Sequence, residues 1–210
     1  MHLMRQLKDR LRLSSLHTVD ASMLWCAFTM AFFGFLRISE LVSPSPTSHD
    51  RHRTLLSRDV KTEDDAITVC IKRSKTDQLG SCVVLRLNAT NRSVCPVRAY
   101  ERYNHSRTTK ACADGPLFTF RAGQHLTRAS VLHHIRKLLW DHTERDRLNT
   151  HSFRIGAATT AADENIPEPD IMRAGRWKST CVRRYIRKTN PSQVNLYGTS
   201  CLGASGQKEG

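Results

Sequence analysis

The sequence has no apolar run of the roughly 18 residues that a membrane-spanning helix requires. Its first ten residues are charged at several positions, and no apolar signal-peptide core follows them. We therefore expect a soluble protein that is not secreted and has no membrane partner.

The cysteines do not have the pattern of a disulfide framework or a zinc site. All seven are widely scattered, their number is odd and no C-x-x-C pair occurs, so we expect reduced thiols. The ten histidines include His133 beside His134, and His49 close to His52, but no Cys or carboxylate accompanies them at matched ligand spacing. The sequence thus predicts no metal site and no cofactor.

Acidic residues are scarce. Asp and Glu number 19 against 33 Lys and Arg, which gives a formal net charge of +14. This excess predicts a polyanionic partner, and the phosphate backbone of DNA or RNA is the simplest one. A chain of 210 residues can bury one substantial core, so we expect a single domain.

Hydrophobic periodicity predicts a mostly α fold with a small antiparallel β-sheet (α+β). Residues 4–42 predict two helices, and the second, Ala21–Leu41, is apolar nearly all round and should be buried. Two β-like runs, 66–71 and 82–85, flank a basic turn segment and predict a hairpin. Further helices are expected at 96–105, at 127–141, from His151 with Thr150 as its N-cap, and at 166–174.

Polar residues with the chemistry for cutting a phosphodiester are spread over these elements. They are Arg37 in LRISE, Lys75 in SKT, His151 and Arg154 in HSFR, Trp177 in GRW, and Tyr185 in RRYIR. No single motif is specific, and the specificity comes from the order and spacing of the motifs. The last four of these residues, from His151 to Tyr185, lie within about 35 positions. At these residues the sequence, from Met4 to Pro191, resembles the tyrosine recombinase (phage integrase) family, above all its Cre-like members and those of eukaryotic DIRS and Crypton mobile elements.

The resemblance implies the recombinase catalytic fold and a strand-exchange reaction on double-stranded DNA. Tyr185 would attack the scissile phosphate, form a 3′-phosphotyrosyl bond and free a 5′-hydroxyl; the 5′-hydroxyl of another strand then reverses the step. No metal or nucleotide is implied, because the protein–DNA ester conserves the bond energy. Trp177 would donate its indole N–H to a non-bridging phosphate oxygen.

Two arginines are expected to stabilise the transition state. Charge that grows on the non-bridging oxygens suits guanidiniums better than ammoniums, and Arg37 and Arg154 are the candidates. Arg37 follows an apolar run, so its charge needs a partner. Glu40, one helical turn on, is expected to orient it.

Two roles in proton transfer have alternatives. Lys75, at the tip of the expected hairpin, is the candidate acid for the leaving 5′ oxygen, with Lys72 as its rival. His151 shares a helix face with Arg154 at i, i+3. It would either donate to the phosphate or accept the phenol proton, and the sequence does not separate these roles.

Other basic residues near these motifs are expected to bind duplex phosphates: Lys72, Arg73, Arg176, Lys178, Arg183, Arg184 and Arg187. We expect a catalytic domain over residues 1–197 and a disordered Gly/Ser-rich tail over 198–210. Family members usually carry an N-terminal DNA clamp, and only about 20 residues precede the first core helix here. We therefore expect a fragment or a degenerate copy of an element, for which a homo-oligomer such as a tetramer on DNA is less expected. The protein would be nuclear in a eukaryote, and cytoplasmic or at the nucleoid in a prokaryote.

Two other functions fit part of the pattern. A type IB topoisomerase shares the chemistry, but the block from His151 to Arg187 is closer to the recombinases. A non-catalytic DNA-binding protein descended from a recombinase would fit the lack of a clamp. The intact tyrosine and both arginines argue against it.

Overall fold

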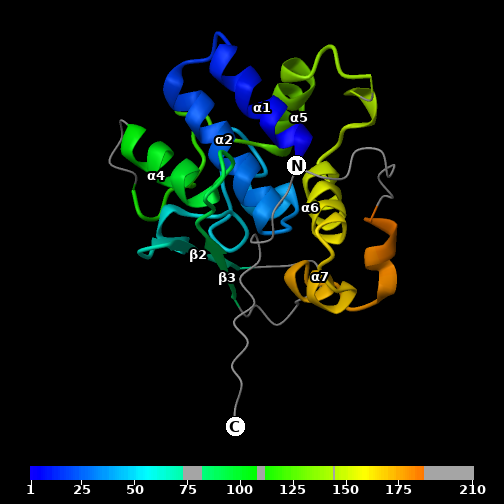
Figure 1. Ribbon diagram of the computed structural model, residues 1–210. Coiled ribbons are helices and arrows are strands. Elements are labelled where there is room, and N and C mark those ends of the chain that lie inside the picture. Colours follow the sequence, from blue (N-terminus) through cyan, green and yellow to red (C-terminus); the bar gives the residue numbers. More distant parts are fainter. Residues whose placement is uncertain (73–81, 108–111, 144, 187–210) are drawn as a thin grey trace.

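Helix α2 (Thr18–Phe33) lies at the centre of the molecule (Figure 1). The computed structural model describes residues 1–72, 82–107, 112–143 and 145–186. Of the 16 residues of α2, eleven are buried, which confirms the prediction from its apolar composition. Helices α1 (His2–Leu13), α4 (Pro96–Ser106) and α6 (Ser152–Asp163) pack against it.

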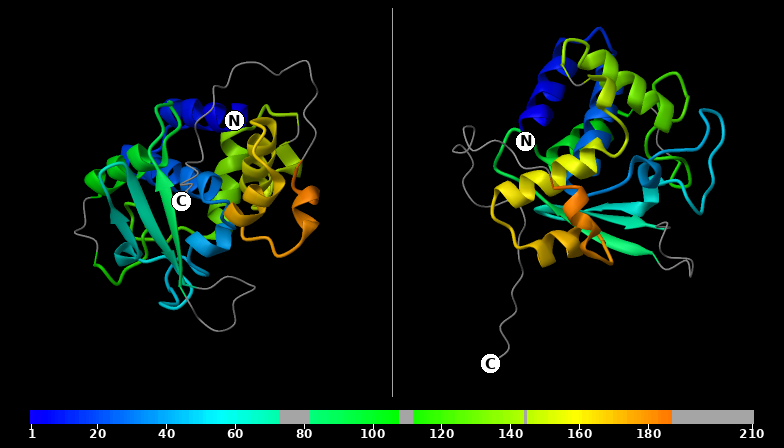
Figure 2. Two further views of the ribbon diagram at one scale, coloured as in Figure 1. Left: turned by 60° about the horizontal axis from the view of Figure 1, so that its bottom comes forward. Right: turned by 90° about the vertical axis from the view of Figure 1, so that its right-hand side faces the viewer.

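A three-stranded antiparallel sheet covers one side of these helices (Figure 2). It consists of β1 (Val60–Thr62), β2 (Ala66–Ile71) and β3 (Val83–Asn88) in that order, with Ile71 opposite Val83. The short 3-10 turn η1 (Ser57–Asp59) leads into β1. The expected hairpin is confirmed. Strand β1 was not predicted, because its three residues are mostly polar and exposed.

The C-terminal half adds α5 (Arg128–Leu138), which packs beside α1, and the 3-10 turn η2 (Arg145–Arg147). Then come α7 (Glu168–Ala174), which packs on α6, and the 3-10 turn η3 (Thr180–Arg184), which packs on α7 (Figure 1). One hydrophobic core joins these elements. No helix in the described part of the chain is long and apolar enough to cross a membrane.

The prediction of one continuous helix over Ala21–Leu41 was wrong. Helix α2 stops at Phe33, and a separate short helix, α3 (Ile38–Leu41), follows. A Cβ on Gly34 would lie 2.9 Å from the Met30 carbonyl oxygen, so glycine is needed at this cap. Phe35 then adopts a left-handed φ of 49°, which does not continue the helix. Arg37 consequently becomes the N-cap of α3.

The expected N-cap of the His151 helix was also wrong. Helix α6 begins at Ser152, with His151 as its N-cap residue and Thr150 buried before it. Asn149 supplies the local hydrogen bonds instead. Its Oδ1 accepts from the His151 N–H at 2.8 Å, and its own N–H donates to Ser152 Oγ at 2.9 Å.

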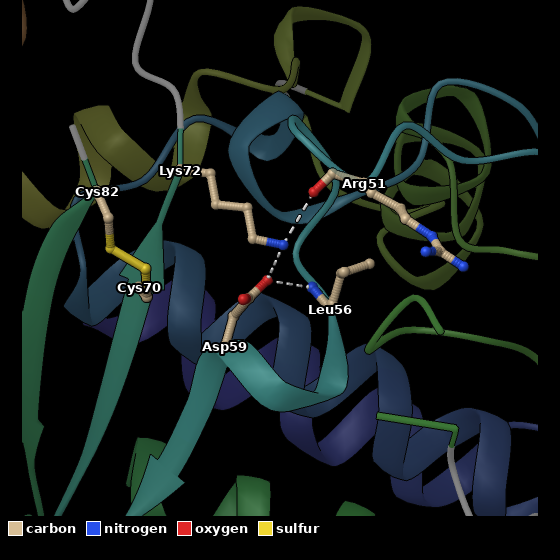
Figure 3. Close-up of a disulfide and its surroundings, with 6 residues drawn as sticks. All are labelled: Arg51, Leu56, Asp59, Cys70, Lys72 and Cys82. Atoms are coloured by element: carbon tan, nitrogen blue, oxygen red, sulfur yellow. Dashed lines mark hydrogen bonds and ion pairs between the residues drawn. A yellow bond between two sulfur atoms is a disulfide. The ribbon is translucent and has the colours of Figure 1, made fainter. Parts of the chain in front are cut away.

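A disulfide joins Cys70 of β2 to Cys82, which directly precedes β3 (Figure 3). The expectation of reduced thiols was therefore wrong for this pair. The antiparallel register brings the two Cα atoms to 5.9 Å, within the range that a disulfide spans. Four other cysteines in the described residues are free thiols, at positions 26, 95, 112 and 181.

Candidate active site

The turn between α2 and α3 brings Arg37 and Glu40 together. The Arg37 backbone N–H donates to Glu40 Oε2 at 2.8 Å, and its Nη1 donates to Glu40 Oε1 at 3.3 Å. The Glu40 side chain is only 4% exposed, whereas that of Arg37 is 25% exposed. Glu40 therefore lies under Arg37 and orients it, while the guanidinium stays open to solvent.

A second guanidinium reaches the same carboxylate. Arg176, in the turn after α7, donates from Nη2 to Glu40 Oε2 at 3.2 Å and from Nη1 to the Gly34 carbonyl at 3.3 Å. Its side chain is 16% exposed, and its φ of 55° is left-handed. The sequence suggested that Arg176 contacts a DNA phosphate. The structure places it in the cluster around Glu40, and the contact with a phosphate stays a prediction.

Arg154, on the first turn of α6, is the third cation of this cluster and is fully buried. Its Nη1 donates to the Phe35 carbonyl at 2.6 Å, and its Nη2 donates to the Gly175 carbonyl. The guanidinium thus ties α6 to both loops that carry the other arginines. Burial, and then the positive charges of Arg37 and Arg176, lower the pKa of Arg154 to about 10. An anion bound beside it would have the opposite effect.

Two aromatic rings cover Arg154. The Trp177 ring centroid lies 4.3 Å from the Arg154 Cζ, and the Tyr185 ring, just after η3, lies 5.1 Å from Trp177 and 5.9 Å from that Cζ. This arrangement requires Gly175, since a Cβ there would lie 1.8 Å from the Trp177 ring. Gly175 also accepts a hydrogen bond from Arg154. Its structural role was missed, although it opens the Gly-Arg-Trp motif.

Two buried donors at this site lack a hydrogen-bond acceptor among the described residues. They are the Arg154 Nε–H and the Trp177 indole Nε1–H. A buried donor without an acceptor costs about 1–3 kcal/mol. Both belong to residues expected to bind a phosphate, and an anionic oxygen is the acceptor that such donors favour.

His151 lies one helical turn before Arg154, at the exposed N-cap of α6. The position agrees with the predicted i, i+3 relation. His151 is exposed, whereas Arg154 is completely buried, and the expectation that both side chains reach one phosphate stays a prediction.

Lys72, which directly follows β2, forms an ion pair and a hydrogen bond at the base of the hairpin (Figure 3). Its Nζ lies 2.7 Å from Asp59 Oδ2 and donates to the Arg51 carbonyl at 3.0 Å. Asp59 also accepts from the Leu56 N–H at 2.7 Å. The rival candidate for the general acid is therefore paired with a buried carboxylate.

The remaining predicted DNA-contact residues divide into two groups. Lys178, Arg183 and Arg184 are exposed around η3, and Arg183 Nε donates to Glu168 at 3.1 Å. Arg73 and Arg187 lie outside the described residues, and so does Lys75, the candidate general acid. Within the described residues, no group of three or more His, Cys, Asp or Glu could hold a metal ion.

Comparisons with known proteins agree with this fold. No family model and no curated protein matches the sequence. The structure resembles XerH site-specific recombinase bound to its difH substrate (TM-score 0.61, 12% identity, 90% of this chain and 50% of that chain). It also resembles FLP recombinase in a Holliday junction complex, with a TM-score of 0.58 and 10% identity over 85% of this chain and 44% of that chain. A third similar structure is the Tn1549 transposon integrase in complex with circular intermediate DNA, with a TM-score of 0.57 and 15% identity over 90% of this chain and 60% of that chain.

The chain has the fold of the tyrosine recombinase catalytic domain. It spans about half the length of the recombinases it matches. At 10–15% identity the likeness concerns the fold alone.

Proposed function

We propose that this chain is the catalytic domain of a site-specific DNA recombinase or integrase, and that it cuts and rejoins duplex DNA during recombination of a mobile element. The observation that carries the proposal is the cluster around Glu40. The guanidiniums of Arg37 and Arg176 share this one carboxylate, and the Arg154 guanidinium lies close by. A tyrosine ring lies beside them, as do two buried donors that have no acceptor among the described residues. The excess positive charge favours a bound anion, and the recombinase fold makes a DNA phosphate the best candidate.

The reaction starts with attack of Tyr185 Oη on the scissile phosphorus. A Tyr–O–P bond forms, the bond from phosphorus to the 5′ oxygen breaks, and the phenol proton passes to a base, for which His151 is the candidate. A free phenol has a pKa of about 10, so the attack needs this base or the positive surroundings. Lys75 supplies a proton to the leaving 5′ oxygen.

Arg37 and Arg154 stabilise the charge that develops on the non-bridging oxygens. Arg37 is partly exposed and already oriented, so it can meet a phosphate directly. Arg154 retains its Nε–H for an acceptor, and Trp177 retains its indole N–H. The side chain of Trp177 lies against both Arg154 and Tyr185, so it also fixes the ring of the nucleophile relative to the arginine.

The test is covalent trapping on a nicked duplex that prevents religation. We expect a protein–DNA adduct with the wild-type chain and none with Tyr185→Phe, because only the nucleophilic oxygen is removed. DNA affinity should be nearly unchanged in this variant. Tyr197→Phe is the matched control and should form the adduct normally.

An adduct that persists in Tyr185→Phe, or that peptide mass assigns to Tyr197, would contradict the proposal. Salt-sensitive DNA binding without any adduct from the wild-type chain would instead favour a non-catalytic DNA-binding protein derived from a recombinase.

A further inference from the structure

A groove far from the candidate active site lies between α1, the N-terminal half of α2 and α4. Its volume is about 540 Å³, within the range of concave sites that hold a ligand or a few side chains. Figure 1 shows α1 and α4 on the side of the molecule away from α7, with α2 at the centre. Helix α2 is 16 residues long, or about 24 Å at 1.5 Å per residue, and Arg37 follows its other end. We call this site the α1–α4 groove.

The lining of the α1–α4 groove combines apolar and cationic side chains. Its apolar residues include Leu11, Leu16, Ala21 and Trp25, and its cations are Lys8, Arg12, Arg98 and Arg102. The remaining lining residues include no Asp or Glu. A phosphate-binding surface needs the cations alone, so the apolar part indicates a ligand that also buries an apolar group.

The four cations are not neutralised by the described part of the chain. Lys8 Nζ donates to the Ser93 carbonyl at 2.5 Å, and Arg98 donates to the carbonyl of Arg92. Arg12 and Arg102 are exposed, and neither has an ion pair among the described residues. Four like charges around one concavity attract an anionic partner.

We propose that the α1–α4 groove binds an acidic, amphipathic segment of a protein partner. Carboxylates of that segment would pair with Arg12 and Arg102, and a large apolar side chain would rest on Trp25 and Leu16. This mode corresponds to a helix or peptide held in a groove by apolar anchors and complementary charge.

Nucleic acid fits the α1–α4 groove less well. A duplex presents phosphates and no apolar group to bury in a concavity. A single strand would stack successive bases on several aromatic rings, whereas Trp25 is the one aromatic residue among the described residues that line the groove. The chain's own residues 187–210 are also unsuitable, because they carry Arg187, Lys188 and Lys208 against Glu209 alone and so match the sign of the groove.

The experiment measures binding of a fluorescein-labelled 14-residue helical peptide that carries Glu on one face and Leu on the other. We expect the double variant Arg12→Glu/Arg102→Glu to weaken binding by at least about tenfold, because two attractions become repulsions. Ala21→Trp places a large side chain in the groove without changing its charge, and it should weaken binding of the peptide to a similar degree. Arg136→Glu, exposed on α5 outside the groove, is the control and should bind normally.

Two further measurements separate the possible ligands. A peptide with the same Glu residues and Gln in place of Leu should bind much more weakly, whereas equal binding would overturn the amphipathic requirement. The proposal would also be overturned if the double variant bound the Glu/Leu peptide like wild type, or if it lost affinity only for a DNA duplex. Tyr185-dependent adduct formation should be unaffected by Ala21→Trp, so this test is independent of the proposed function.

Discussion

Two buried carboxylates occupy the same local motif in this protein and differ in their charge balance. Glu40 accepts from the backbone N–H of Arg37, and Asp59 accepts from that of Leu56, each three residues earlier at the start of a short helical turn. Asp59 then meets one ammonium, that of Lys72. Glu40 meets two guanidiniums, with Arg154 close by as an uncompensated third cation.

We expect this difference between a structural ion pair and a site that binds an anion. The Lys72–Asp59 pair is neutral, and it links the hairpin base to the loop before β1 (Figure 3). The Glu40 cluster keeps an excess of positive charge and lowers the pKa of Arg154 and Arg176 by burial and mutual repulsion. An anion would relieve that repulsion, so the cluster is the expected place for a phosphate.

The largest expected effect distinguishes Lys75 from Lys72. If Lys75 protonates the leaving 5′ oxygen, Lys75→Ala should slow single-turnover cleavage by roughly 10²- to 10⁴-fold. A substrate with sulfur at that bridging position needs no proton, so it should restore most of the rate. Because Lys72 is paired with Asp59, sulfur should not rescue Lys72→Ala. If sulfur rescues Lys72→Ala but not Lys75→Ala, then Lys72 is the general acid. The Asp59 site would then take part in catalysis, like the proposed Glu40 site.

The next effect concerns Arg37. Arg37→Ala should lower single-turnover cleavage by about 10²- to 10³-fold, as expected for a lost donor to transition-state charge. Glu40 keeps its ion pair with Arg176 after this change, and Arg154 loses a repulsive neighbour, so the free energy of unfolding should fall by less than in Asp59→Asn. Sulfur at the bridging position should not rescue this variant. A large loss of stability with normal cleavage would make the Glu40 cluster structural, like the Asp59 pair.

The smallest effect on function is expected at Asp59. Asp59→Asn leaves the Lys72 ammonium without its buried partner and should lower the free energy of unfolding by about 3 kcal/mol, measured with urea. Asp65→Asn is the control, because its ion pair with Arg86 is mostly exposed and is worth less than about 1 kcal/mol. The salt dependence of DNA binding should be the same in both variants. A changed slope for Asp59→Asn alone would place Lys72 among the DNA contacts.

Local patterns predicted most of the fold. The apolar composition of α2 predicted a buried helix, and two β-like runs around a basic turn predicted the β2–β3 hairpin. The break between α2 and α3 was missed, because Phe33-Gly34-Phe35-Leu36 continues the apolar pattern of the helix. A glycine within such a pattern can lie in a helix or cap one, and the choice depends on the surrounding contacts.

The sequence predicted which residues belong to the candidate site, but not which of them contact each other. Arg37, Glu40, Arg154, Trp177 and Tyr185 were named from their motifs, and the structure brings them together. The contact between Arg176 and Glu40 joins residues 136 positions apart and has no local signal. The disulfide between Cys70 and Cys82 was missed for a related reason, since it depends on strand register and not on a cysteine motif.

By itself the sequence determined which chemical groups are present and which local elements carry them, because side-chain type and hydrophobic period are properties of neighbouring residues. It thereby indicated a basic, mostly helical protein, and its resemblance to the tyrosine recombinases predicts Tyr185 as a nucleophile and Arg37 and Arg154 as phosphate-binding residues. Only the tertiary structure decided which charges share a carboxylate. Pairing depends on distance and burial in space, so three arginines converge near Glu40 and keep their excess charge, while Lys72 is neutralised by Asp59.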